Sequence, residues 1–262
     1  MSSVCFLINA VSFVAVLAAL AVMRMPEFVR PAQRHNRALH ALREGVSYSW
    51  HFAPIRSILL LVVPVSIVGA SYVVLMPIFA ERVFHGGTHI LGYLMAAPGI
   101  GALAAGMYLA SRKSVLGAGT RITAGAMLMG GGLLGLGMTG VLWLAMILLV
   151  LVGLGMTLQT ALANTVLQTL ADDDKRGRVM SLFTVAFTGT APIGSLLAGS
   201  MAAWLGVQYT VILGGFVCIA GGLVFAQALP AIREAARPVY QRKGIIATGL
   251  DNAAALSQPP ED

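Results

Sequence analysis

The sequence predicts an all-α membrane protein with seven transmembrane helices. Of its 262 residues, 58% are hydrophobic and only 10% are charged, whereas a soluble domain usually carries about 25% charged residues. Long apolar runs recur along the chain, and a run of about 20 apolar residues crosses a bilayer as a helix. Basic residues gather in alternate connections between these runs, which is the pattern that membrane topology produces.

The predicted spans are bounded by charges and turn residues, because helices that are apolar on nearly all sides show little periodicity. Arg24 follows the first apolar run rather than preceding it, so this run is interpreted as a span and not as a cleaved signal peptide. The predicted spans are residues 4–23, 57–80, 89–111, 119–139, 141–168, 178–204 and 207–229.

The distribution of lysine and arginine predicts the orientation. All but one of the 17 basic residues lie in the connections 24–56, 112–121 and 171–178 or in the tail after residue 229, and Arg82 is the exception. By the positive-inside rule, the crowded side is cytoplasmic. The N-terminus is therefore expected outside and the C-terminus inside.

The chain divides into four predicted regions: a transmembrane helix over 1–24, a cytoplasmic connector over 25–56, a six-helix bundle over 57–230, and a cytoplasmic tail over 231–262. The tail is expected to be largely disordered. The connector repeats apolar residues at helical spacing, which fits an amphipathic helix at the membrane surface or an ordinary helix packed on the bundle. These apolar residues are Leu39, Leu42, Val46 and Trp50.

Composition and residue placement argue against several functions. The net charge of +7 comes from loop residues, so nucleic-acid binding is not expected. Cys5 and Cys218 lie inside apolar segments and suggest neither a disulfide nor a metal site. No acidic residue or histidine lies in the middle of a predicted span, which argues against an enzyme and against a proton-coupling group within this chain. No cofactor is expected.

Polar residues stack on one side of several predicted spans, and Asn or Gln amides are costly to expose to lipid. One interpretation is a substrate pathway, and the other is ordinary hydrogen bonding within and between helices. The pathway candidates are Tyr72 in the second span, Thr157, Thr160, Asn164 and Gln168 in the fifth, and Thr184 and Thr188 in the sixth.

Proline and glycine interrupt the same spans. Proline bends a helix by removing a backbone donor, and glycine lets another helix approach closely. The residues expected to serve helix packing or gating are Pro64, Pro77, Gly189, Pro192, Gly194 and Gly199.

Four stretches of the sequence carry a family resemblance: Phe6-Leu-Ile-Asn-Ala-Val-Ser-Phe13, Leu42-Arg-Glu-Gly45 with Tyr48, Gly92–Gly101, and Arg176–Ser181 leading into Ala191–Ser195. Over about residues 4–230, the chain resembles the C-terminal part of a major facilitator superfamily transporter. The resemblance is strongest to the bacterial exporter branch that includes the enterobactin exporter and the transmembrane secretion effectors.

The resemblance implies that the seven spans correspond to the sixth through twelfth spans of that family, a C-terminal half-bundle plus one preceding helix. It implies export of small molecules by alternating access in the bacterial inner membrane, proton-coupled in the complete protein. The expected partners are the lipid bilayer, an unidentified small molecule and a missing N-terminal transporter half. The alternative is a non-transporting scaffold or the inert remnant of a truncated transporter.

The cytoplasmic loop motif Arg176-Gly177-Arg178 has two interpretations. Its arginines can pair with Asp172–Asp174 or with lipid phosphates, or they serve only as a topology signal. In another loop, Ser111 stands where the family pattern has an aspartate. The aspartate that the family's charge relay uses is therefore missing from this loop.

Overall fold

A computed structural model describes residues 13–14, 17–18, 38–112 and 116–243. The chain divides into a unit of residues 1–40 and a compact unit of residues 41–262. The predicted first span lies outside the described residues, apart from residues 13–14 and 17–18, which are helical. The second unit contains the helical bundle.

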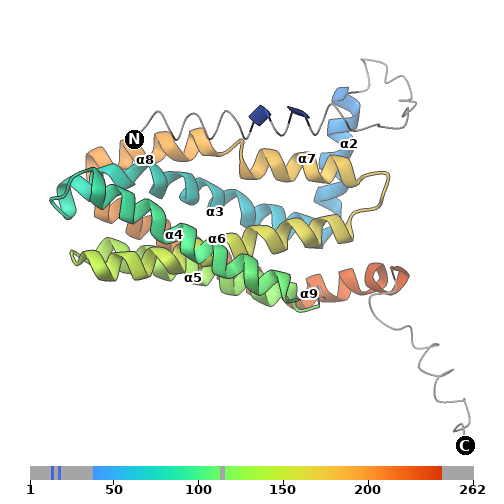
Figure 1. The fold of residues 1–262 in the computed structure, drawn as a ribbon. Helices are drawn as coiled ribbons and strands as arrows, with labels where there is room; N and C mark the ends of the chain where they lie inside the picture. Colours follow the sequence, from blue (N-terminus) through green and yellow to red (C-terminus); the bar gives the residue numbers. More distant parts are fainter. Residues whose placement is uncertain (1–12, 15–16, 19–37, 113–115, 244–262) are drawn as a thin grey trace, which may run out of the picture. The chain divides into compact units, whose positions relative to one another are not determined.

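In the described residues every regular element is a helix, which confirms the all-α membrane fold (Figure 1). Five helical segments are long and apolar enough to cross a membrane: Ala53–Val83, Thr88–Ala110, Leu142–Leu170, Arg176–Leu205 and Val207–Arg242. The helices are α2 Ala38–His51, α3 Ala53–Ile78, the π-helix η2 Phe79–Val83, α4 Thr88–Ala110, α5 Ala118–Met138, α6 Leu142–Leu170, α7 Arg176–Phe187, α8 Ala191–Leu205 and α9 Val207–Arg242.

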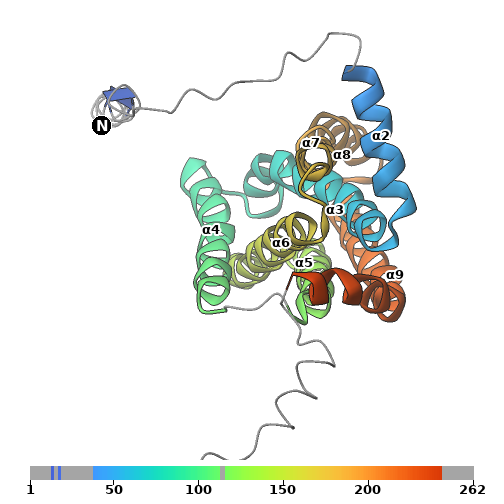
Figure 2. The ribbon, with the colours of Figure 1, turned by 90° about the vertical axis from the view of Figure 1, so that its right-hand side faces the viewer.

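The helices pack as two groups that share a seam. Helix α6 packs between α4 and α5, whereas α3 packs against α9 and against α7 and α8. Figure 2 shows the bundle end-on, with α3 and α6 near its centre. The seam is the contact of α5 with α9, where a Cβ at Gly130 would lie only 2.8 Å from the carbonyl oxygen of Gly215. Glycine is needed there because the two backbones touch.

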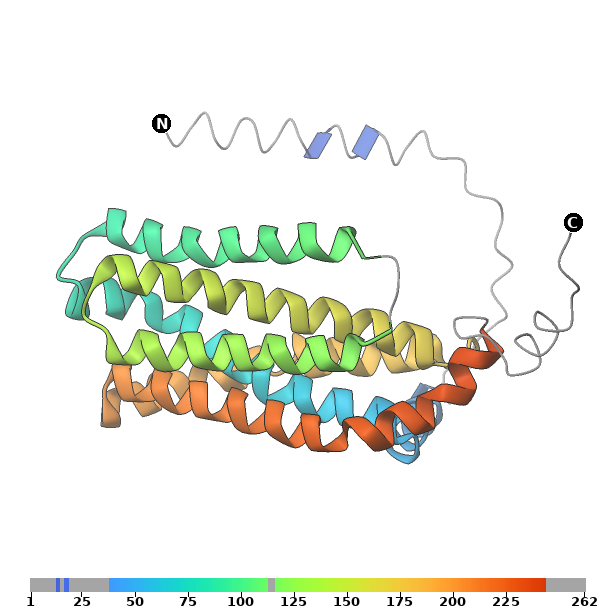
Figure 3. The same cartoon turned by 90° about the horizontal axis from the view of Figure 1, so that it is seen from below.

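Connections alternate between the two ends of the bundle (Figure 3). The last turn of α4, the start of α5 and residues 171–175 lie at the end where α9 finishes, and residues 84–87, 139–141 and 206 lie at the opposite end. Apart from Arg82 in η2, the basic residues that flank the described helices therefore lie at one end, and which side of the membrane this end faces stays a prediction.

The predicted sixth span is two helices rather than one bent helix. Helix α7 ends at Phe187, residues 188–190 form a turn, and α8 begins at Ala191. Pro192 stands in the first turn of α8, where its missing N–H breaks no helical hydrogen bond. In α3, by contrast, Pro64 lies within a continuous helix, and the π-helix begins directly after Pro77 and Ile78.

Helix α9 continues to Arg242, past the predicted span end at residue 229. Residues 231–242 are therefore helical, whereas the sequence predicts a largely disordered tail. The cause is an apolar stripe, because Ile232, Ala236 and Val239 are all buried against the bundle. The rest of the predicted tail, residues 244–262, lies outside the described residues.

Candidate functional site

The polar residues of α6 form a half-buried row along one side of the helix. Gln168 Nε2 donates to Asn164 Oδ1 at 2.6 Å, and Arg176 Nη2 donates to Gln168 Oε1 at 2.9 Å. These bonds link two amides of the helix to the arginine that begins α7. The row thus ends at the basic connection, where the cytoplasmic side is expected.

A pocket of about 250 Å³ lies between α3, α4 and α6, and it brings two predicted pathway residues together. Tyr72 of α3 and Thr157 of α6 supply the polar groups of its wall. The rest of the lining is apolar or glycine: Val73, Met76, Leu94, Met95, Pro98, Gly99, Ala102, Gly153 and Met156. Apolar walls with a few placed polar groups are typical of small-molecule sites.

The pocket depends on a close crossing of α4 and α6. A Cβ at Gly153 would collide with the backbone of Pro98, and a Cβ at Gly101 would collide with the carbonyl of Val150. The two backbones are therefore in contact at the pocket floor. This contact brings Pro98 and Gly99 of α4 to the same pocket as Thr157 of α6.

The remaining predicted pathway residues are not part of this pocket. Thr160 Oγ1 donates to the Met156 carbonyl at 2.7 Å, and Thr184 Oγ1 donates to the Met180 carbonyl at 3.0 Å. Both are hydrogen bonds within a helix, one of the two interpretations open for Ser and Thr. Thr184 and Thr188 are exposed on α7 or directly after it.

The predicted packing residues differ in their surroundings. A Cβ at Gly194 would collide with the Ile67 carbonyl, and Ser71 Oγ of α3 donates to the Gly194 carbonyl at 2.8 Å, so Gly194 marks the crossing of α3 and α8. A Cβ at Gly189 would lie 2.6 Å from the Val185 carbonyl oxygen. A Cβ at Gly199 would meet open space in the described structure.

The connector helix α2 contacts the loop motif at the basic end of the bundle. Tyr48 Oη donates to Asp172 Oδ2 at 3.0 Å, and Lys175 Nζ lies 4.7 Å from the centre of the Tyr48 ring. Burial raises the pKa of Tyr48 above its usual value, so the phenol stays protonated as a donor at neutral pH. A Cβ at Gly45 would lie 3.0 Å from Arg178 Cβ.

Gln159 is a polar residue that is missing from the sequence-based candidates. It lies on α6 at 0% exposure, and neither its amide nitrogen nor its amide oxygen has a hydrogen-bond partner in the described part of the chain. Its position next to Thr160 places it off the polar row, facing Gly125 of α5. Its spacing from Asn164 does not place it in the polar row. The sequence still offered one indication of an unusual residue, because an amide side chain is rare inside a long apolar run.

Comparison with known proteins identifies a family. A family model described as transmembrane secretion effector matches residues 2–249, nearly the whole chain. No curated protein matches the sequence.

Proposed function

Because the chain belongs to the transmembrane secretion effector family of the major facilitator superfamily, a family of membrane transporters, we propose that it exports small molecules by alternating access. One observation carries the proposal. A pocket that contains Tyr72 and Thr157 lies on the side of α6 from which Asn164 and Gln168 lead to Arg176. A substrate held in the pocket therefore has a row of polar groups between it and the basic end.

The pocket favours a partly apolar substrate. Its volume of about 250 Å³ is slightly below the range for small-molecule sites, about 300–1,000 Å³. The Tyr72 hydroxyl and the Thr157 hydroxyl can each donate and accept one hydrogen bond, while Met76, Leu94 and Met156 offer apolar contact. We infer a compact substrate with an apolar body and one or two polar groups, and a second set of helices that closes the pocket.

The broken sixth span suits a moving gate. The turn at 188–190 separates α7 from α8, and α7 begins at Arg176, which is bonded to the polar row. In transporters, discontinuous helices at the binding site are common and alternating access rocks one bundle against another. We infer that α7 moves relative to α8 as the cytoplasmic side opens and closes.

Proton coupling is proposed for the complete transporter rather than for this bundle. The acidic residues of the described membrane-spanning segments lie toward their ends, with Glu81 in η2 and Glu234 in the last turns of α9. A coupling carboxylate is expected at membrane depth. An N-terminal half, as the family resemblance implies, or a second copy of the chain is the proposed source of this group. We also propose that the protein is located in the bacterial inner membrane, with its N-terminus outside.

Deletion of the gene in its host tests the proposal. Untargeted mass spectrometry of medium and cells is expected to find at least one small molecule that is retained inside the deletion strain. Complementation with wild-type chain or with Thr165→Ala restores its release. Complementation with Tyr72→Phe, Asn164→Ala or Gln168→Ala leaves release roughly tenfold lower, because each removes a polar contact of about 1 kcal/mol or more.

Thr165 is the matched control because it is an exposed residue of α6 whose hydroxyl donates to the Ala161 carbonyl of its own helix. The opposite outcome is that the wild-type chain is found in the membrane while no compound differs in amount between the deletion strain and the wild-type strain. That result would replace export with the scaffold or remnant alternative. If all four variants restore release equally, the chain exports but neither the Tyr72 side of the pocket nor the α6 row is the pathway.

A further inference from the structure

A larger cavity lies between the start of α5 and the second half of α9. Its volume is about 440 Å³, and Ile58 of α3 and Leu170 of α6 contribute to its lining. Near the middle of the bundle α5 and α9 are in backbone contact at Gly130 and Gly215. The last turns of α9, which contain Pro230 and Pro238, change direction in Figure 3. The cavity lies where the two helices part.

The depth of this cavity is apolar. Ile58, Ile122, Phe225 and Leu229 line it and are each at most 9% exposed. A water-filled cavity with such walls is unfavourable, and empty apolar cavities bind apolar ligands. Helix α9 exposes 67% of Val224 and 57% of Phe216 on its surface, as expected for a helix that contacts lipid chains.

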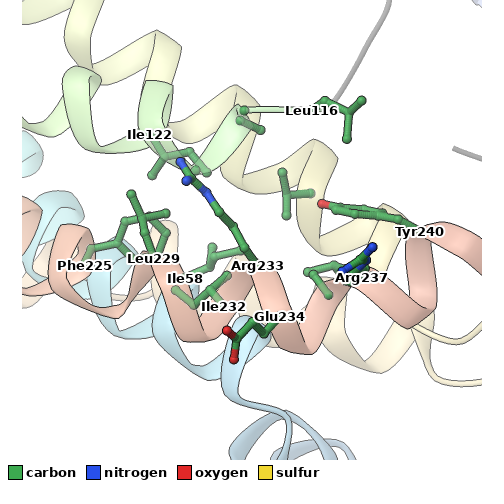
Figure 4. Close-up of a pocket in the computed structure, with 16 residues that line it drawn as sticks. Ile58, Leu116, Ile122, Phe225, Leu229, Ile232, Arg233, Glu234, Arg237 and Tyr240 are labelled. Carbon is green, nitrogen blue, oxygen red and sulfur yellow. The ribbon is translucent and has the colours of Figure 1, made fainter. Parts of the chain in front are cut away.

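The mouth of the cavity is cationic. Arg233 and Arg237 line it, and Figure 4 shows the Arg233 side chain extending toward Ile122 of α5. Arg233 Nη2 donates to Thr120 Oγ1 at 2.8 Å, which holds it at this position. Glu234 is the acidic residue of the lining, and in Figure 4 its carboxylate lies on the other side of α9 from the Arg233 guanidinium.

The start of α5 adds a group that favours an anion at this mouth. Leu116, Gly117 and Ala118 line the cavity, and helix α5 begins after Gly117 with no side-chain cap. The first N–H groups of a helix attract negative charge.

We propose that this cavity holds one acyl chain of an anionic phospholipid, with the lipid phosphate on Arg233 and Arg237. The apolar depth selects an amphiphile over a free anion, and the arginines select an anionic headgroup over a zwitterionic one. The site lies at the end of the bundle that carries the basic connections, where headgroups of the cytoplasmic leaflet are expected. The proposal goes beyond export and does not depend on it.

Native mass spectrometry of the full chain in neutral detergent tests it. The protein is incubated with equal amounts of phosphatidylglycerol and phosphatidylcholine that carry identical acyl chains. We expect one phosphatidylglycerol retained roughly tenfold over phosphatidylcholine. The double variant Arg233→Gln/Arg237→Gln is expected to lower phosphatidylglycerol retention roughly tenfold, to the level of phosphatidylcholine, because the preference rests on these two cations, and to leave phosphatidylcholine retention unchanged.

The matched control is Arg112→Gln/Arg242→Gln, which removes the same charge at the same end of the bundle but outside this cavity. Its phosphatidylglycerol retention is expected to change less than about twofold, because it touches only general surface charge. Equal losses in the two double variants would overturn the proposal, and so would retention of both lipids at equal levels by wild type.

A steric variant tests the apolar part separately. Ala236 lines the cavity at 3% exposure, so Ala236→Phe is expected to fill it and abolish retention of phosphatidylglycerol. Should this variant not fold as a monodisperse species, the exposed arginine variants still decide the question. Glycerol 3-phosphate at millimolar concentration is expected not to displace the lipid. Its displacement would overturn the acyl-chain assignment and leave only an anion site.

Discussion

Gln159 and Gln168 show how differently one side chain type can be placed on a single helix. Gln168 is half-buried and bonds to both Asn164 and Arg176. Gln159 is at 0% exposure, with both amide atoms unpaired in the described structure. A buried amide without hydrogen bonds costs free energy that an apolar side chain of similar shape avoids.

Replacing Gln159 with methionine is therefore expected to stabilise the protein. The unpaired amide costs about 1–3 kcal/mol, and methionine fills a similar volume. Thermal unfolding in detergent, followed by size-exclusion chromatography of a fluorescent fusion, measures the change in Tm. Gln168→Met is the comparison variant and is expected to lower Tm, because it breaks two hydrogen bonds. A lower Tm for Gln159→Met would show that the amide has a partner essential to the fold.

At the scale of elements, the crossing of α4 and α6 is the contact that builds the pocket. Gly153→Ala places a methyl group against the backbone of Pro98, which cannot yield as a side chain can. The helices must separate, at a cost of about 1–3 kcal/mol for overpacking. We expect a lower Tm in the same chromatographic assay and weaker release of the retained compound by the complemented strain.

Gly106→Ala on α4 is the control for this crossing, because a Cβ there meets nothing within 4 Å. Alanine is a better helix former than glycine, by about 0.8–1.0 kcal/mol in a helix interior, so its Tm is expected to stay unchanged or to rise. A Gly153→Ala protein as stable as Gly106→Ala would contradict the contact between the two backbones.

Helix α2 turns one face to the bundle, and the other described residues leave an apolar face of it uncovered. Gly45 and Ser49 are buried, whereas Val46 is 45% exposed and Trp50 is 57% exposed. Arg56 lies 5.9 Å from the centre of the Trp50 ring, a cation–π pairing, and tryptophan is enriched at the membrane–water interface. This arrangement favours the membrane-surface interpretation of the connector, while its other face packs on the bundle.

Trp50 fluorescence measures that contact with lipid. In a Trp143→Phe/Trp204→Phe background, Trp50 is the remaining tryptophan. Reconstitution into vesicles that carry brominated lipid chains is expected to quench its emission by about half or more, because an interfacial helix sits about 5–10 Å into the bilayer boundary. A single-tryptophan protein with Trp50→Phe and native Trp143 reports a span residue for comparison. Emission of Trp50 that is unaffected by bromination would place α2 in water.

The helix boundaries show what local residues determine at this scale. Charges and turn residues predicted the ends of α4, α5 and α6 within a few residues, because a charged side chain rarely enters the bilayer. The break at 188–190 had no such marker. Pro192 predicted a bend, but its place in the first turn of α8 depends on how α8 packs on α3 at Gly194. That packing is tertiary and is not readable from local residues.

At the scale of the whole molecule, the pocket also could be predicted only in part from the sequence. Tyr72 and Thr157 were predictable because polar residues stand out in apolar spans. The contributions of Pro98 and Gly153 were not, because nothing in the local sequence says which helices cross. The cavity between α5 and α9 was equally hidden, since Arg233 and Arg237 resemble ordinary tail residues until α9 is seen to extend to Arg242.

Orientation in the membrane is a property of the whole chain, and cysteine labelling tests it. Helix α6 has 29 residues, so it is about 44 Å long and exceeds the bilayer core of about 30 Å. Its two ends must lie on opposite sides. We expect Gly87→Cys, in a Cys5→Ala/Cys218→Ala background, to react with an impermeant maleimide added to intact cells, and Asp173→Cys to react only in inverted vesicles.

The control for this labelling is Ser111→Cys. It is expected to react with the maleimide under the same conditions as Asp173→Cys, because the two residues share the basic end of the bundle. Labelling of Gly87→Cys and Asp173→Cys from one side would contradict the spanning fold itself. Labelling of all three with reversed sidedness would keep the fold and overturn only the orientation. In that case the basic connections would face outward against the positive-inside rule, and the polar row from Asn164 to Arg176 would lead to the exterior instead of the cytoplasm.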